Sequence, residues 1–390
     1  MKKKKLLIVA HHLTIGGVQK SLIAALKVLD YEKFDVTLYL RKNRTDLLPF
    51  VDERVNVIIN DDNHHYYRKP YAVFLQILIA IFSLSGKKEK AEKFNQKLSN
   101  AIVKYAMEYE RKRFFKSEKY DIAIAYVHGY PALFVAECVD ADKKFVFYHT
   151  STDELHSIHE RIISEFDKIV AIHNEQKELI KKWYPEIAGR ITIVENYCDK
   201  ALIEEQSKEF NVDKPEGKTV FCSCGRFSPV KGFALAVEAA KVLKEKNISF
   251  LWYFVGDGPE RANLEKYIKE YNLQEEIIIT GMQKNPYPYI NACDIYVQPS
   301  YEESLGLTIL EAHRLCKPVI ATKTMGGFKT IENEVNGVLC EINAQSIAET
   351  IGKLITDKEL FENIKTKLKN IDYSEELEVY KAQWQNLLEE

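Results

Sequence analysis

The chain has 390 residues, more than one ordinary hydrophobic core organises, so two domains are expected. Its content of 46% hydrophobic and 29% charged residues is typical of a globular protein in water. The net charge of −2 argues against nucleic acid as a partner. The charge is uneven, because residues 1–200 contain 33 Lys and Arg against 27 Asp and Glu, and the remainder contains 22 against 30. A basic first half favours an anionic partner, such as a membrane surface.

The cysteines and the amino terminus indicate a cytoplasmic protein. The 7 cysteines are scattered without Cys-x-x-Cys spacing, which favours a reducing compartment. Cys222 and Cys224 fall on one face of an apolar run and are expected to be buried thiols rather than metal ligands. The apolar run after Lys2–Lys5 stops at His11, too early for the apolar core of a signal peptide.

Apolar runs in the first half predict the buried strands of a parallel sheet, separated by helical segments. This alternation is typical of a doubly wound α/β domain. The predicted strands are Leu6–Ala10, Asp35–Leu40, Val55–Ile59, Asp121–Val127, Lys144–Tyr148 and, as the last of this half, Asp167–Ile172.

A glycine pair, Gly16–Gly17, separates the first strand from an amphipathic helix. The dinucleotide pattern Gly-x-Gly-x-x-Gly is absent at this turn, which argues against a dehydrogenase. Paired glycines let the backbone approach a ligand closely, although they also occur in ordinary turns.

Two histidines follow predicted strands directly. His128 comes after the fourth strand and His149 after the fifth. Ligands of doubly wound sheets bind beyond the carboxyl ends of the strands, so both positions suit a site. Both are candidates for the site, and His128 is equally suited to a structural role.

The segment 71–116 departs from the alternating pattern. It begins with an apolar run of about fourteen residues, 71–84, which is shorter than the roughly twenty needed to span a bilayer. Many Lys and Arg follow between 87 and 116. An apolar helix beside a basic helix is typical of a segment that lies on a membrane surface, and also of two helices that pack on a sheet with one basic face in solvent.

The second half repeats the α/β pattern after a polar linker at 204–217. Trp384, Leu387 and Leu388 predict a last helix that packs back on the first domain. The expected domains are therefore 1–197 with the helix 373–390, and 198–372. The predicted strands of the second domain begin at Thr219, Phe250, Ile277, Ile295, Val319 and Gly337.

The stretch Pro299–Ala312 predicts a strand end, a turn and a helix that starts near Gly306–Thr308. The start of a helix favours an anion, because its N–H groups are unpaired and its dipole is positive there. Glu303 lies in the turn and Glu311 lies inside the helix. Two carboxylates beside an anion site suit the neutral hydroxyls of a sugar and a ribose. The pattern therefore indicates a nucleotide-sugar.

Two cations lie in a second turn of the same half. Arg226 and Lys231 follow the predicted strand that starts at Thr219, within Gly-Arg-Phe-Ser-Pro-Val-Lys-Gly. Arg offers a planar fork and Lys a point charge, and both suit phosphate oxygens.

The pattern Pro-Ser-x-x-Glu-x-x-Gly-Leu-x-x-x-Glu-Ala at 299–312, with Lys317-Pro-Val-Ile-Ala-Thr after it, resembles the signature of the retaining glycosyltransferases of family four, also called glycosyl transferases group one. The turn 225–232 is similar to the family's Gly-Arg…Lys-Gly. The resemblance implies the GT-B fold, which is α/β with two facing Rossmann-like doubly wound domains and an interdomain cleft.

The resemblance also implies roles for individual residues. Arg226 and Lys231 would hold the diphosphate, Glu303 the donor sugar and Glu311 the ribose. His149, in a stretch similar to the family's sugar-contacting segment, would position the sugar and is favoured over His128, which would lie on the acceptor side if it is not structural. Further donor contacts are expected from the diphosphate-binding Gly16, Gly17, Gly306, Leu307 and Thr308, and from the base-binding backbone at Gly281, Met282 and Gln283.

The expected activity is metal-independent transfer of a hexosyl unit from a nucleotide-diphosphate sugar to an acceptor hydroxyl, with retention of configuration. UDP is favoured over GDP, and since the nucleotide-sugar is a substrate, no cofactor and no metal are expected. The acceptor would be a lipid-linked or cell-surface glycan, such as a capsule or exopolysaccharide, and the enzyme would act on the inner face of the membrane. A catalytically silent GT-B partner subunit and a nucleotide-sugar epimerase are the alternatives.

Overall fold

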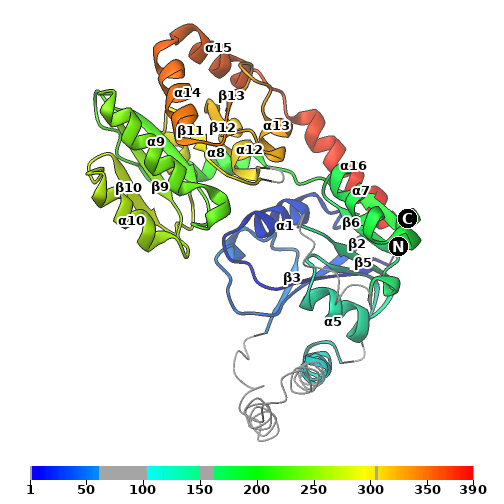
Figure 1. Ribbon diagram of the computed structural model, residues 1–390. Helices are drawn as coiled ribbons and strands as arrows, with labels where there is room; N and C mark the ends of the chain where they lie inside the picture. Colours follow the sequence, from blue (N-terminus) through cyan, green and yellow to red (C-terminus); the bar gives the residue numbers. More distant parts are fainter. Residues whose placement is uncertain (1, 61–102, 117, 150–161, 304–305, 390) are drawn as a thin grey trace, which may run out of the picture. The chain divides into compact units, whose positions relative to one another are not determined.

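The computed structural model describes residues 2–60, 103–116, 118–149, 162–303 and 306–389. The chain divides into two compact units, Met1–Tyr197 with Leu377–Glu390, and Cys198–Glu376 (Figure 1). Each unit is built on its own parallel sheet. The apolar run 71–84 lies outside the described residues.

The first unit contains a sheet of 7 parallel strands in the order β3-β2-β1-β4-β5-β6-β7. The strand order reverses beside β1, as in doubly wound folds. The strands are β1 Lys4–Ala10, β2 Phe34–Leu40, β3 Asn56–Ile59, β4 Lys119–Ala125, β5 Asp140–Phe147, β6 Lys168–Ala171 and β7 Ile191–Ile193. The helices are α1 Gly17–Val28, α5 Tyr130–Cys138, α7 Asn174–Trp183 and α16 Ser374–Glu389.

The prediction that 167–172 is the last strand of this half was wrong, because β7 pairs with β6 beyond it. Only Ile191–Ile193 extend this edge of the sheet, and two of these three residues are only partly buried. Strands of about three residues leave no clear alternation or apolar run in a sequence.

Both faces of the first sheet are covered. Alternate residues of β1 point to opposite faces, so Leu6 and Ile8 pack with α1 and α16, whereas Leu7 and Val9 pack with α5 and the helical residues 103–115. Trp384 of α16 is only 1% exposed within the first of these clusters. The last helix of the chain is therefore part of the first unit's core.

The second unit contains 6 parallel strands in the order β10-β9-β8-β11-β12-β13. The fold prediction of two Rossmann-like, doubly wound α/β domains is thus confirmed. The strands are β8 Thr219–Cys224, β9 Phe250–Val255, β10 Ile277–Gly281, β11 Ile295–Gln298, β12 Val319–Thr322 and β13 Gly337–Cys340. The helices are α8 Lys200–Gln206, α9 Phe233–Glu245, α10 Arg261–Glu270, α11 Tyr287–Ala292, α12 Leu307–Arg314, α13 Met325–Thr330, α14 Ala344–Thr356 and α15 Lys358–Lys369.

Helices also cover both faces of the second sheet. Leu243 of α9 and Ile351 of α14 belong to the cluster on one face. Ile290 of α11 and Ile309 of α12 belong to the cluster on the other. Because α12 lies on a buried face, its first turn is placed firmly at the carboxyl edge of the sheet.

The chain passes between the units at 197–198 and at 376–377. In the first unit, the rings of Tyr197 and Tyr380 stack with centroids 5.3 Å apart. In the second unit, the buried Arg314 donates to the carbonyl oxygen of Cys198 at 3.0 Å and to Glu376 at 2.5 Å. Within each unit, these contacts therefore connect the two points at which the chain enters or leaves that unit.

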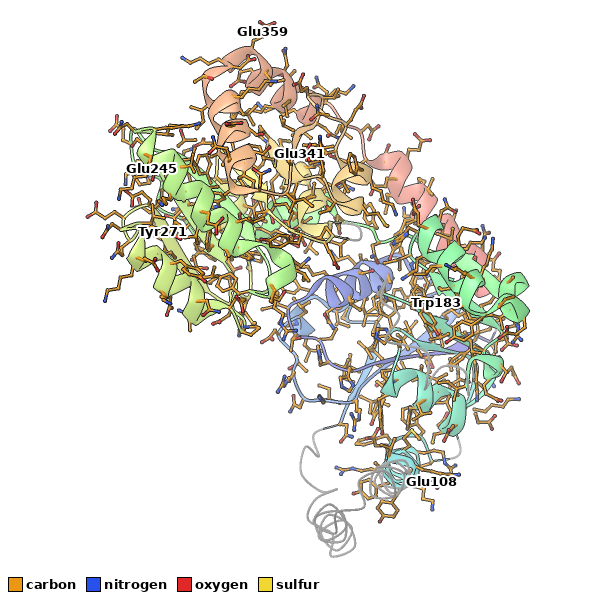
Figure 2. All side chains as sticks on the ribbon, in the orientation of Figure 1. Glu108, Trp183, Glu245, Tyr271, Glu341 and Glu359 are labelled. Carbon is orange, nitrogen blue, oxygen red and sulfur yellow. The ribbon has the colours of Figure 1, made fainter. Side chains whose placement is uncertain are left out.

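The surface of the second unit carries exposed carboxylates, in agreement with its acidic composition. Glu245, Glu341 and Glu359, which Figure 2 labels, are exposed. Within the described ranges, no helix combines the length and the apolar character needed to cross a bilayer.

Candidate functional site

The candidate donor site of the second unit lies where β8, β11 and β12 end. Parallel strands bring their following loops to one edge of the sheet, and backbone hydrogen bonds join these loops. The N–H of Tyr301 donates to the carbonyl oxygen of Val230 at 2.8 Å. The N–H of Gly326 donates to the carbonyl oxygen of Glu303 at 2.7 Å. The loop after β11 is thus held between the other two.

Gly232 explains how closely the first two loops approach. Its φ is +67°, and a Cβ atom added there would lie 1.9 Å from the carbonyl oxygen of Pro299. Only glycine can occupy this position without moving backbone. The close approach brings Lys231 next to the loop after β11.

Lys231 and Glu303 form an ion pair at this junction. Lys231 Nζ lies 2.7 Å from Glu303 Oε2, and the side chains are 29% and 11% exposed. The same Oε2 accepts hydrogen bonds from Gln298 at 3.2 Å and Ser300 at 3.4 Å. Oε1 has no partner among the described residues, and the ammonium keeps further N–H donors. The pair can therefore still bind a hydroxyl and an anion.

Gln298 belongs to the candidate site by its contacts, although the sequence analysis missed it. It is 4% exposed, and its carboxamide oxygen accepts from the hydroxyls of Tyr296 and Thr308, each at 3.0 Å. Its Nε2 donates to Ser300 at 2.8 Å as well as to Glu303. A polar residue that ends an otherwise apolar strand was the available signal. Gln298 ties Glu303 to the first turn of α12.

Arg226 and Glu311 do not join the Lys231–Glu303 pair. The exposed Arg226 has no ion-pair partner within the described residues, so its guanidinium is available to a ligand. Glu311 is 4% exposed, and its Oε1 accepts from the hydroxyl of Tyr287 at 3.0 Å. Burial raises the pKa of Tyr287, which keeps that hydroxyl a donor. Of the four predicted charged residues, the structure brings together only Lys231 and Glu303.

The predicted backbone contacts lie at the same edge. Gly306 precedes α12 with φ +69° and no side-chain cap, so the N–H groups near Leu307 and Thr308 open towards the loop. Gly281 ends β10, Met282 is 68% exposed, and Gln283 donates to the carbonyl oxygen of Thr280 at 2.8 Å. Because β9 alone separates β10 from β8, these groups lie about 10 Å from the loop of Arg226, a span that suits a nucleoside diphosphate.

His149 follows β5 in the first unit. Its ring lies 5.0 Å from that of Tyr126 and 5.9 Å from that of Phe147. Neither ring nitrogen has a hydrogen-bond partner among the described residues. Burial lowers the pKa of His149 to about 3, so the ring is neutral at pH 7. It can donate or accept a hydrogen bond, but it does not supply charge.

His128, Gly16 and Gly17 lie at the same edge of the first sheet, because they follow β4 and β1. The ring of His128 lies 6.5 Å from that of Tyr148, and burial lowers its pKa. Gly16 precedes α1 in an extended conformation, and Gly17 is the first residue of that helix. These predicted residues belong to the first unit, and the charged ones belong to the second.

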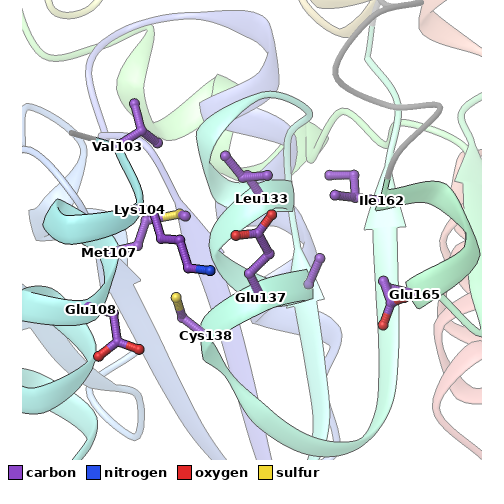
Figure 3. Close-up of a pocket in the computed structure, with 10 residues that line it drawn as sticks. Val103, Lys104, Met107, Glu108, Leu133, Glu137, Cys138, Ile162 and Glu165 are labelled. Atoms are coloured by element: carbon purple, nitrogen blue, oxygen red, sulfur yellow. The ribbon is translucent and has the colours of Figure 1, made fainter. Parts of the chain in front are cut away.

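A groove of about 660 Å³ in the first unit lies elsewhere (Figure 3). Its wall includes Lys104, Glu137 and Cys138, and the amine of Lys104 points towards Glu137. Since α5 returns antiparallel to β4, its last residues lie at the amino edge of the sheet, opposite the histidines. Burial raises the pKa of Cys138 to about 11, which makes it a poor nucleophile. The groove is not part of the candidate site.

The thiols of the second unit are structural. Cys222 Sγ and Cys224 Sγ lie 3.6 Å apart in the core, and burial raises the pKa of Cys222. Across the part of the chain that the structure describes, no three His, Cys, Asp or Glu side chains form a group that could hold a metal ion.

Comparison with known proteins finds a family match in the second unit. Residues 204–370, nearly all of the second unit, match the family model described as Glycosyl transferases group 1. The second unit is therefore similar to a domain of this family. It includes the segments 225–232 and 299–312, on which the predicted resemblance rests.

Two bacterial relatives match about half of the chain. The UDP-Gal:alpha-D-GlcNAc-diphosphoundecaprenol alpha-1,3-galactosyltransferase of Escherichia coli is 30% identical over 210 residues, 51% of this chain and 54% of the relative. The lipopolysaccharide core biosynthesis glycosyltransferase LpsE of Rhizobium meliloti is 32% identical over 171 residues, 44% of this chain and 49% of the relative. The chain therefore spans about half the length of the curated relatives it matches.

The fold has solved counterparts over the full length. The crystal structure of Anabaena Alr3699/HepE in complex with UDP and glucose superimposes with a TM-score of 0.70 at 16% identity and covers 99% of both chains. At this identity the likeness shows the fold alone. It supports the GT-B class for the pair of Rossmann-like units.

Proposed function

We propose that the protein is a glycosyltransferase that moves a hexosyl unit from a nucleotide-diphosphate sugar to an acceptor hydroxyl, with retention of configuration. The observation that carries this proposal is the Lys231–Glu303 pair, 2.7 Å apart beside the start of α12. The ammonium of Lys231 and the start of α12 can bind a phosphate, and the carboxylate oxygen of Glu303 without a partner can bind a sugar hydroxyl.

The cations of the second unit would stabilise the leaving group. Negative charge grows on the diphosphate as the glycosidic bond breaks, and Arg226 and Lys231 would neutralise it in place of a metal. The N–H groups near Leu307 and Thr308 would add partial positive charge. Glu303 would accept hydrogen bonds from donor-sugar hydroxyls through Oε1, and Glu311 with Tyr287 would face the ribose.

The first unit would supply the acceptor side. His149 is neutral at pH 7 because its pKa is about 3, so it would hold a sugar hydroxyl by a hydrogen bond rather than by charge. His128 would contact the acceptor, and Gly16–Gly17 would close over the diphosphate. The departing phosphate would take the proton of the acceptor hydroxyl in a front-face attack.

The names of the similar proteins support a UDP-sugar and a lipid-linked or cell-surface glycan. The E. coli relative is named for UDP-Gal and a diphosphoundecaprenol-linked acceptor. LpsE is named for lipopolysaccharide core biosynthesis, and HepE was crystallised with UDP and glucose. We therefore propose action at the inner face of the cell membrane, with 71–116 as the segment that would contact lipid.

A donor panel tests the proposal. Thermal unfolding is measured with UDP- and GDP-hexoses, and a UDP-hexose is expected to raise the melting temperature with concentration. Arg226→Ala should lose most of this shift, whereas Lys266→Ala should keep it, because Lys266 is an exposed cation on α10. No shift with any nucleotide-sugar would contradict the proposal.

Turnover separates a transferase from the alternatives. Release of UDP is followed with and without a lipid-linked glycan acceptor, and a transferase releases UDP only with acceptor. An epimerase would convert the donor without acceptor, and a silent subunit would do neither. Glu303→Ala should reduce transfer by about 100-fold or more, and Glu302→Ala, its exposed neighbour, should not.

A further inference from the structure

A second group of basic residues lies at the carboxyl edge of the first sheet, where Gly16–Gly17 and His149 are the expected donor contacts. His11 and His12 follow β1, and Arg41, Lys42 and Arg44 follow β2. We call these five residues the basic cluster. They stand beside the reversal of strand order between β1 and β4, the place where doubly wound sheets bind their ligands.

Backbone hydrogen bonds fix the two loops that carry the basic cluster. The N–H of Lys42 donates to the carbonyl oxygen of His11 at 2.9 Å. The N–H of Leu13 donates to the carbonyl oxygen of Arg44 at 2.8 Å. Leu13 is fully buried and so anchors this joint in the core. The cations are therefore held on a built frame rather than on loose loops.

Arg41 is the most firmly held of the cations. Its Cζ lies 3.6 Å from the ring centroid of Tyr130, and its Nε lies 3.7 Å from Oε1 of Glu110. Glu110 is fully buried and accepts a hydrogen bond from Tyr39 at 2.9 Å. Arg41 is thus partly neutralised and forms the inner wall of the cluster.

Lys42 and Arg44 have no ion-pair partner within the described residues. Burial, followed by the charges of Arg41 and Arg44, lowers the pKa of Lys42. Burial, followed by the charges of Lys42 and Arg41, lowers the pKa of His11 to about 4, which leaves it neutral. The negative charge of Asp46 opposes the lowering of the pKa of His12. Like charges held together in this way are stabilised by an anion.

We propose that the basic cluster binds a phosphate or diphosphate group of the acceptor. The inference rests on the proposed transferase function and deepens it, because it gives the acceptor a charged group next to its reacting hydroxyl. Arg44 offers a planar fork and Lys42 a point charge, which together suit phosphate oxygens. The cations expected to hold the donor diphosphate, Arg226 and Lys231, belong to the other unit.

Pyrophosphate is the probe, titrated into the full chain by isothermal calorimetry. The Arg226→Ala/Lys231→Ala variant removes the proposed donor contribution and serves as the background. In that background, Lys42→Ala/Arg44→Ala should weaken pyrophosphate binding by at least about 10-fold. Equal affinity with and without the Lys42 and Arg44 substitutions would overturn the proposal.

Lys181→Ala/Lys182→Ala is the matched control, since it removes the same charge from the same unit. Both lysines lie in the last turn of α7, which returns from β6 to the amino edge of the sheet, away from the basic cluster. This variant should bind pyrophosphate like the background. If it weakens binding as much as Lys42→Ala/Arg44→Ala, general charge explains the effect and the site assignment is wrong.

Two further arms separate a lipid from a soluble acceptor. Phosphatidylcholine vesicles with a long-chain prenyl diphosphate should bind the parent at least about 10-fold more tightly than free pyrophosphate if the group belongs to a lipid. Equal affinity assigns the site to a soluble phosphorylated acceptor. The UDP-hexose melting shift is measured on the same variants, so a failure of the donor proposal is seen there independently of the pyrophosphate result.

Discussion

The carboxyl edges of the two sheets differ in how tightly their loops are packed. Each contains a glycine with positive φ immediately before a helix, Gly129 at +79° before α5 and Gly232 at +67° before α9. A Cβ atom at Gly129 would meet no described atom within 4 Å, whereas one at Gly232 would lie 1.9 Å from the backbone of Pro299. An added side chain therefore has room at Gly129 and none at Gly232.

This difference explains which unit is easier to recognise. Where one backbone lies directly against another, the residue types in both loops are restricted, and they form a pattern that a sequence can show. The family model matches 204–370, within the second unit. We expect the loops of the first edge to tolerate more variation, because a side chain added at Gly129 meets no other atom there.

Substitution of the two glycines gives the largest expected effect. Gly232→Ala should lower the free energy of unfolding by about 3 kcal/mol or more, because it adds an overlap with backbone to a strained φ, and it should abolish the UDP-hexose melting shift. Gly129→Ala should cost about 1–2 kcal/mol from strain alone and keep the shift. Urea unfolding and the donor panel measure both quantities.

Gly217→Ala is the control within the second unit, because Gly217 has φ +76° and no atom within 4 Å. It should behave like Gly129→Ala. If Gly232→Ala unfolds no more easily than Gly217→Ala and still binds donor, the loops are not packed as described.

The chain crossings provide the next comparison. Arg314 is 2% exposed, lies 3.6 Å from the Tyr373 ring and bonds Cys198 and Glu376. Arg314→Leu should cost about 2–4 kcal/mol, because the Cys198 carbonyl oxygen and the stacked ring lose their partner. Arg314→Lys should not restore this loss, since a lysine cannot both stack and fork.

Two milder variants limit this interpretation. Glu376→Ala should cost less than about 1 kcal/mol, because the carboxylate is 43% exposed. Tyr197→Leu in the first unit removes a ring stack and should cost about 1 kcal/mol. A loss in Glu376→Ala as large as in Arg314→Leu would show that the ion pair, rather than the buried carbonyl contact, dominates.

Gln298→Ala tests whether side chains hold the second edge as firmly as the backbone does. The substitution leaves Tyr296, Thr308 and Ser300 without a shared partner in a buried site. We expect a loss of about 2 kcal/mol in urea unfolding and a higher KM for the donor, because Glu303 is no longer held. Gln283→Ala, whose side chain bonds only the Thr280 carbonyl oxygen, should change stability little. An unchanged donor KM in Gln298→Ala would contradict the proposal that Gln298 positions Glu303.

Acid should weaken the fold through buried histidines, the smallest of the expected effects. Burial lowers the pKa of His313 to about 4, below the usual 6.5. Above pH 6.5 neither the folded nor the unfolded state binds this proton. Between pH 6.5 and about 4 only the unfolded state binds it, so stability falls as the pH falls.

For His313 this loss is about 1–2 kcal/mol between pH 7 and pH 5. Urea unfolding of the parent and of His313→Asn at both pH values measures it, and the variant should show the smaller change. His149 in the first unit has the same direction of pKa shift, and His149→Asn should also reduce the acid sensitivity. An identical pH dependence in all three proteins would contradict this account.

Much of the fold was accessible from the sequence. The run Phe250–Val255 coincides with β9, whose six residues are all buried. An uninterrupted apolar run of that length in an α/β chain indicates a buried parallel strand. The strand β7 was missed because three residues show no pattern. The positions of Glu303 and Lys231 in loops after strands were also accessible, since turns and helix starts depend on local residue types.

The contacts of the site were not accessible. The sequence analysis assigned Lys231 to a phosphate and Glu303 to a sugar, yet the structure pairs them, and it pairs Glu311 with Tyr287. Gln298 and the basic cluster carry no recognisable motif. The loops of the basic cluster follow different strands, which only sheet order brings together, whereas the partners of the Gln298 side chain lie within ten positions of it in the chain.

The sequence by itself determined the order of strands and helices and the loops in which the charged residues stand, because apolar periodicity and turn residues act over a few positions. Only the tertiary structure decided which atoms meet. Lys231 reaches Glu303 across 72 positions of the chain because β8 and β11 are neighbours and because Gly232 lets two backbones touch. That contact depends on the packing of parallel strands, and no local pattern encodes it.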